Sequence, residues 1–222
     1  MTAPDGYDGG TASKRLFGLY PALVLDIVDP DNLGRIKVGF PWLGDAGADV
    51  SAWSRLVSLY ADDNQGWQIL PSVGTEVIVG FEAGSIDRPY IVGAVWNGKE
   101  TLPDTPAAAN NKRLLKTRSG SLLEFDDSDG AAKVTLSMAS GHQLVLDDSA
   151  QQVSFKHSNG CQLVMNAGGQ VSITANSTVE VSASAVNVHA PMVVCDGIVQ
   201  CQTLITQSVV SPSYTPGAGN IW

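Results

Sequence analysis

The chain has 222 residues, of which 44% are hydrophobic, so one or two domains with an apolar core are expected. Its 22 acidic and 13 basic residues give a formal net charge of −9. An assembly this acidic repels nucleic acid and anionic membrane surfaces, so we expect no nucleic-acid partner. The first residues carry neither a basic nor an apolar stretch, which predicts assembly in the cytoplasm without a signal peptide.

The sequence pattern of the N-terminal half is typical of a small all-β domain. Residues 1–15 are rich in Gly, Asp, Thr and Ser and are predicted to form a flexible segment. Residues 16–98 contain five strand candidates between turn residues, namely 22–28, 34–40, 54–59, 76–81 and 90–95. No amphipathic helix separates these candidates, so they favour a five-stranded OB-fold barrel.

A linker and a repeat region follow. Residues 99–115 are rich in Pro, Ala and Asn and are predicted to be a linker. Beyond them, Gly120, Gly141 and Gly160 are each followed by Leu at +3, an apolar residue at +5 and Asp or Asn at +6. The +3 and +5 residues share one face of a strand, and the Gly and Asp or Asn residues mark the turns.

The repeat then shortens along the chain. Val-x-apolar triplets begin at Val134, Val153, Val171, Val179 and Val186, with spacings of 19, 18, 8 and 7 residues. A coil needs roughly 20 residues to enclose its own core, so the short spacing predicts several chains wound together. We therefore predict that residues 116–210 form the shaft of an intertwined triple-stranded β-helix, a homotrimer.

The same pattern predicts which residues form the trimer core and the tip. The core candidates are Leu144, Leu146, Val153, Phe155, Val171, Ile173, Val179, Val181, Val186 and Val188. Residues 211–222 break the repeat and are predicted to be a C-terminal tip segment, in which Ile221 and Trp222 are candidates for docking a partner. The three cysteines, Cys161, Cys195 and Cys201, are interpreted as small buried apolar residues in a reducing compartment.

The polar residues do not form a recognisable catalytic pattern. The Asp126/Asp127 and Asp147/Asp148 pairs recur with the repeat, and adjacent strand residues point to opposite faces, so we favour turn formation over a glycosidase pair. His189 has no second ligand at metal spacing; a surface or packing role is favoured over an axial site in the trimer. The prediction is a non-enzymatic protein without cofactor or metal.

Five motifs resemble one known family. GRIKVGFPW at 34–42, WSRLV at 53–57, LPSVGTEVIVGF at 70–81 and DRPYIVGAVWN at 87–97 resemble the OB domain of the phage baseplate assembly protein V and VgrG spike family. KTRSGSLLEFDD at 116–127 resembles the start of that family's β-helix, and the resemblance covers about residues 16–200.

The resemblance implies a homotrimeric central spike of a contractile tail, a type VI secretion system or an extracellular contractile injection system. Such a spike nucleates the baseplate and punctures the target envelope, which it contacts transiently. Only about 15 residues precede the barrel, so a separate baseplate hub protein above the OB domains is expected. The short 99–115 segment leaves no room for the lysozyme domain of some phage spikes, and a PAAR-like tip protein at the C-terminus is left open.

One alternative function stays open from the residues. Trimeric β-helices also serve as tail spikes that bind or cleave cell-surface glycan. That function needs a groove lined by acidic and aromatic residues, whereas no Trp or Tyr occurs between Lys156 and Tyr214. A nucleic-acid role for the barrel aromatics Trp42 and Trp53 is disfavoured, since both are expected to fill the barrel or the trimer interface.

Overall fold

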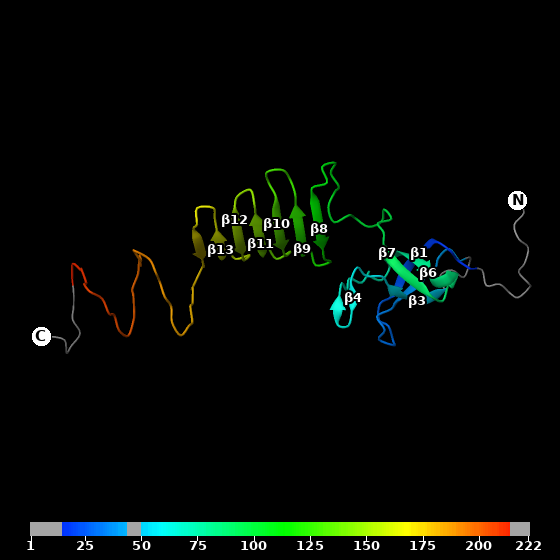
Figure 1. Cartoon of the computed structure of the whole chain (residues 1–222), viewed down its shortest axis with the longest axis horizontal. Helices are drawn as coiled ribbons and strands as arrows, with labels where there is room; N and C mark the ends of the chain where they lie inside the picture. Colours follow the sequence, from blue (N-terminus) through cyan, green and yellow to red (C-terminus); the bar gives the residue numbers. More distant parts are fainter. Residues whose placement is uncertain (1–14, 44–49, 214–222) are drawn as a thin grey trace, which may run out of the picture.

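The computed structural model describes residues 15–43 and 50–213. Figure 1 shows an elongated molecule with a barrel near one end, a ladder of strands in the middle and a zigzag of extended chain beyond it. The strands confirm the predicted all-β class and the closed five-stranded barrel in the N-terminal half. Residues 1–14 of the predicted flexible segment and the docking candidates Ile221 and Trp222 lie outside the described residues.

The barrel follows the strand order of an OB fold. Its strands are β1 (Leu19–Asp26), β2 (Ile36–Gly39), β3 (Ser51–Leu56), β6 (Glu76–Phe81) and β7 (Pro89–Ala94). They close in the order β1-β2-β3-β7-β6, with β6 returning to β1. β3 and β7 pair in parallel, and the other four contacts are antiparallel.

The barrel is stable because its strands alternate inward apolar residues with outward residues. The fully or nearly fully buried side chains are Ala22, Val24, Ile36, Val38, Phe40, Val77, Val79 and Ile91. Burying each larger side chain of this set contributes about 1.5–3 kcal/mol. Phe40 also packs against Trp42 and Phe81, with ring centroids 6.0 and 5.5 Å away.

A short hairpin and a 3-10 turn lie between the predicted barrel strands. β4 (Ala61–Asp62) and β5 (Gln65–Gly66) form a small hairpin that projects from the barrel. A single 3-10 turn, η1 (Glu82–Gly84), joins β6 to β7. Strands of two residues have no readable alternation, so the sequence pattern could not separate this hairpin from a turn.

The second sheet is an antiparallel meander of seven strands. Its strands, in spatial and sequence order, are β8 (Lys112–Lys116), β9 (Leu122–Asp126), β10 (Lys133–Ser137), β11 (Gln143–Asp147), β12 (Gln152–Lys156), β13 (Gln162–Met165) and β14 (Val171–Thr174). Gly120, Gly141 and Gly160 adopt φ of 87°, 93° and 96° in the turns, a region that favours glycine. β8 starts four residues before position 116, inside the predicted linker.

Residues 175–213 form no strand or helix in the single chain. They run as extended segments between bends, seen as the zigzag beyond β13 in Figure 1. Bends lie at Ser184, Pro191, Asp196, Gln202, Gln207 and Pro212, so the extended segments shorten from about seven to five residues. A strand needs a hydrogen-bonded neighbour, which one chain does not supply here, so the triple-stranded β-helix stays a prediction. Within the described ranges, no helix has the length and apolar character needed to cross a bilayer.

Candidate functional site

The register of the second sheet aligns apolar side chains in two rows on one face. The first row contains Leu115, Leu123, Leu136, Leu144, Phe155, Leu163 and Ile173. The second row starts at Arg113 and continues through Phe125, Val134, Leu146, Val153, Met165 and Val171. We call these two rows together the apolar face. The structure thus brings six predicted core candidates, from Leu144 to Ile173, onto one surface.

The apolar face is open to solvent in the single chain. Leu136 and Phe155 are each 47% exposed, and Ile173 is 64% exposed. Cross-strand pairs of this kind normally pack against a second layer, and soluble monomers rarely expose an apolar patch that spans a whole sheet. The face is therefore a candidate surface for association.

The opposite face is mixed and partly charged. Its edge row alternates in sign, because Lys112 pairs with Asp126, Asp126 with Lys133, and Lys133 with Asp147. The hydroxyl and backbone N–H groups of Ser128 hydrogen bond to Asp126 and lower the pKa of its carboxyl. Such a face can remain in contact with water, whereas the apolar face is expected to pack against a second layer.

The carboxylate pairs of the sequence are parts of turns. Asp147 Oδ1 accepts hydrogen bonds from the backbone of Ala150 and from the hydroxyl of Ser149, which lower the pKa of the carboxyl. Asp126 serves its own turn in the same way. These geometries agree with the turn interpretation of both pairs.

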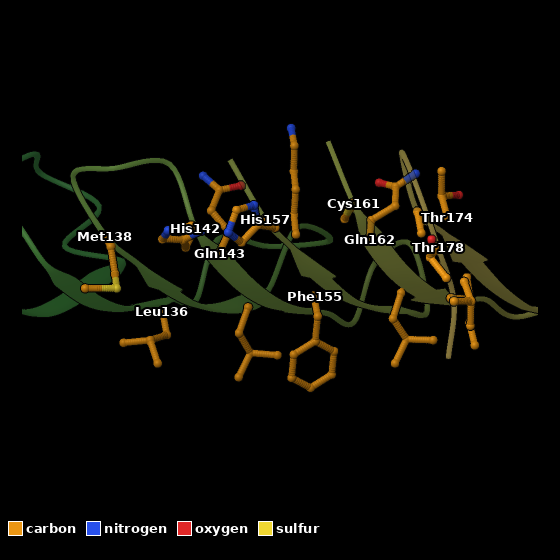
Figure 2. Close-up of a pocket in the computed structure, with 16 residues that line it drawn as sticks. Leu136, Met138, His142, Gln143, Phe155, His157, Cys161, Gln162, Thr174 and Thr178 are labelled. Carbon is orange, nitrogen blue, oxygen red and sulfur yellow. The ribbon is translucent and has the colours of Figure 1, made fainter. Parts of the chain in front are cut away.

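A shallow hollow of about 800 Å³ lies over the apolar face and one of its edges. In Figure 2, Leu136 and Phe155 project to one side of the sheet, whereas Gln143, Gln162 and Thr174 project to the other. A glycan-cleaving groove needs acidic and aromatic residues in its lining. None of the residues that line this hollow is Asp or Glu, and Phe155 is its one aromatic residue apart from two histidines.

Two imidazoles meet at the edge of this hollow. The rings of His142 and His157 have centroids 4.3 Å apart and planes inclined by 49°. Their Nδ1 atoms accept hydrogen bonds from the backbone of Ser158 and Asn159, respectively. Cys161, directly before β13, lines the same hollow (Figure 2). No three His, Cys, Asp or Glu side chains gather at metal-binding distance anywhere in residues 15–43 or 50–213.

The remaining sequence candidates lie in the extended segment beyond β14. Val179, Val181, Val186 and Val188 are all well exposed in the single chain, and His189 follows them. Cys195 and Cys201 are exposed free thiols, and Cys161 is half-buried. The predicted burial is thus not seen for Cys195 and Cys201 in one chain, since no other part of residues 15–43 and 50–213 covers this segment.

The tryptophans of the barrel take part in its own packing. The Trp42 indole Nε1 donates to the Pro21 carbonyl over 2.7 Å, and its ring stacks on Tyr20 with centroids 4.8 Å apart. The guanidinium of Arg35 lies 5.9 Å from the centre of the Trp53 ring. Both tryptophans are thus engaged within the barrel and are not arranged as a free stacking platform.

Comparisons with known proteins agree with this architecture. Residues 20–96 match the model of the type VI secretion system/phage-baseplate injector OB domain. The spike protein VgrG3 of Vibrio cholerae is 33% identical over 113 residues, 48% of this chain and 11% of the relative. VgrG1a of Pseudomonas aeruginosa is 37% identical over 91 residues, 40% of this chain and 14% of the relative.

A third relative extends further along the chain. The actin cross-linking toxin VgrG1 of Vibrio cholerae is 27% identical over 163 residues, which is 60% of this chain and 15% of the toxin. Residues 20–96 thus form an OB domain of the type VI secretion system/phage-baseplate injector family, and the chain that carries it is similar to VgrG spike proteins. It spans only 11 to 15% of the length of the curated relatives that it matches.

Proposed function

We propose that this chain is the structural central spike of a contractile tail or contractile injection system and works as a homotrimeric needle. The observation that carries the proposal is the apolar face, which adjoins an injector OB barrel and is uncovered in the single chain. Three copies provide the simplest cover, because three sheets can close as a triangular prism with their apolar faces inward.

The proposed trimer extends into the segment beyond β14. There the extended pieces of five to seven residues are too short to enclose a core alone, and pieces from three chains would alternate around the axis. Val179 and Val181, and then Val186 and Val188, would form successive inner layers. Each layer of strands adds about 4.8 Å of height, so the seven strands of the sheet account for a shaft of roughly 30 Å before this segment begins.

The mechanism that we propose is mechanical. In a closed prism every strand has neighbours above and below, so no unpaired edge runs along the needle and bending must break many backbone hydrogen bonds together. Tail contraction would then be transmitted through the shaft to the target envelope. The proposal includes no enzymatic step, cofactor or metal.

The partners and the setting belong to the same proposal. The relatives are named as spike proteins of type VI secretion systems. By analogy, the chain would assemble in the cytoplasm, meet a baseplate hub protein above residues 16–98, carry residues 116–210 as its shaft and present residues 211–222 to a PAAR-like tip protein. It would function at the baseplate centre of a virion or injection particle.

The location of the chain in a particle tests this function. An affinity-tagged chain should copurify with sheath and tube proteins from the producing cells, and cryo-electron microscopy should place three copies on the particle axis below the tube. Copies found instead at the particle periphery, as expected of a glycan-binding tail spike, would refute the central-spike function.

A further inference from the structure

The two edges of the second sheet, where its strands turn back, carry opposite charges. One edge, here the acidic edge, contains Asp126, Asp127, Asp129, Asp147 and Asp148 together with Lys112 and Lys133, a formal charge of −3. The other, here the basic edge, contains Lys116, Arg118 and Lys156 together with His142 and His157, a formal charge of +3 with neutral histidines. Residues 116–122, 137–143 and 156–162 of the basic edge include no Asp or Glu.

Within the part of the chain that the structure describes, most of these charged side chains form no ion pair. Lys112 lies 3.7 Å from Asp104 and 3.6 Å from Glu124. In residues 15–43 and 50–213, no ion pair forms at Asp127, Asp148 or Arg118. Strands of five residues hold the two edges about 15–20 Å apart, so one sheet does not pair its edges with each other.

Cyclic closure brings these opposite edges together. A three-fold rotation has no translation along its axis, so each sheet meets the next one head to tail, with unlike edges in contact at equal height. β11 has His142 directly before its first residue and Asp148 directly after its last residue. In a closed ring, His142 of one chain therefore lies at the height of Asp148 of the next chain.

The two ends of β9 also carry residues of opposite charge. Asp127 directly follows β9, and Arg118 lies in the turn that leads into β9. We propose that the acidic edge of one chain docks on the basic edge of a second copy at each corner of the prism, through Asp127 with Arg118 and through Asp148 with His142, His157 and Lys156. The inference rests on the trimer of the proposed function and adds the contact that joins its chains.

The turns also fit between one another at such a corner. Turns at the basic edge join β8 to β9, β10 to β11 and β12 to β13, whereas turns at the acidic edge join β9 to β10, β11 to β12 and β13 to β14. The two sets are thus offset by one strand, and protruding turns of one chain face the gaps of the next. Pairing of like edges, as in a two-fold dimer, would place like charges together, so the edges favour a closed ring.

Cross-linking of the wild-type chain tests the contact directly. A zero-length carbodiimide joins carboxylates to lysine amines that touch, and Asp148–Lys156 and Asp129–Lys116 links should form. Mixing isotopically light and heavy chains before assembly should show that these links join different chains. A trimer without either link would overturn the edge pairing but leave the trimer intact, whereas a monomeric chain would overturn the proposed function as well.

Charge reversal provides the second measurement. Asp127→Lys with Asp148→Lys makes both edges basic. Arg118→Glu with His142→Glu lowers the formal charge of the basic edge from +3 to 0 and places one carboxylate opposite Asp127 and another opposite Asp148. Each double variant should need at least about tenfold more protein for half-assembly, since like charges then meet at every corner. All four substitutions in one chain should restore assembly. Thr135→Lys, in the middle of β10, is the matched control and should leave assembly unchanged; equal loss in the control, or no rescue, would overturn the proposal.

Discussion

Leu144 of β11 and Phe155 of β12 are direct cross-strand partners, and the Phe155 side chain remains 47% exposed in the single chain. The pair lies in the middle of a row that crosses all seven strands, so the same arrangement continues on both sides of it. Each of the five inner strands is therefore paired on both sides, while the apolar face of the sheet is not covered by a second layer.

Phe155→Asp should prevent assembly of the shaft. In the proposed trimer the substitution buries three unpaired carboxylates at one level, at a cost of several kcal/mol for each. Size-exclusion chromatography with light scattering should show monomer or aggregate. Ser154→Asp is the matched control on the other face and should remain trimeric; a normal trimer of Phe155→Asp would show that the apolar face is not the interface.

Val181→Asp should weaken the needle beyond the sheet. Val181 is 69% exposed in one chain but is predicted to face the axis of the intertwined segment. The substitution should lower the thermal midpoint of the trimer markedly, while Ser182→Asp, on the neighbouring outward position, should leave it nearly unchanged. If Ser182→Asp were the damaging change, the inward and outward positions of this segment would have to be exchanged.

Asp29→Asn should destabilise the barrel near neutral pH and in weak acid alike. Asp29 is buried and accepts hydrogen bonds from Arg35 Nε and Nη2 and from backbone groups, and the Arg35 side chain holds its pKa well below the usual range. Because the pKa is lower in the folded state, the stabilisation is present above the unfolded-state value near 4 and is lost only as pH falls through the lower folded value.

Urea unfolding followed by tryptophan fluorescence at pH 7 and pH 5 checks this prediction. The free energy of unfolding of the wild-type chain should exceed that of Asp29→Asn by a similar amount at both pH values. A margin that disappears already at pH 5 would mean that Asp29 is protonated there and that Arg35 does not hold it as a carboxylate.

Trp42→Phe should cost the barrel about 1 kcal/mol, the usual net contribution of one hydrogen bond. The variant keeps an aromatic ring against Tyr20 but loses the bond from Nε1 to the Pro21 carbonyl. Trp53→Phe is the matched control, because the Trp53 indole N–H donates no hydrogen bond within the described part of the chain. Chemical denaturation of both variants should rank Trp42→Phe as the less stable.

The fold was largely predictable because its patterns are local. The alternation of apolar and polar residues predicted the five barrel strands to within a few residues. The Gly-x-x-Leu-x-apolar spacing predicted the turns before β9, β11 and β13 and the residues of these strands that lie on the apolar face. The β4–β5 hairpin was missed because two-residue strands carry no period. The start of β8 at Lys112 was not predicted, because the polar residues Lys112 and Arg113 continue the composition of the linker. Only the strand register shows that they pair with Asp126 and Phe125.

The assembly surface was only partly predictable. The residues of the repeat indicated Leu144, Leu146, Val153 and Phe155 as core positions, and the register places all four on one face. The opposite charges of the two edges were missed, although Asp-rich and Lys-, Arg- or His-containing turns alternate visibly in the sequence. Only the meander shows that every second turn lies at the same edge, so that the charges separate in space.

The mass of the chain in solution is the most direct measurement of whether three copies form one spike. Multi-angle light scattering on the full-length protein should give about three times the chain mass of 23.3 kDa, without dissociation on dilution into the nanomolar range. A stable, soluble monomer that leaves the apolar face exposed would contradict the trimeric needle.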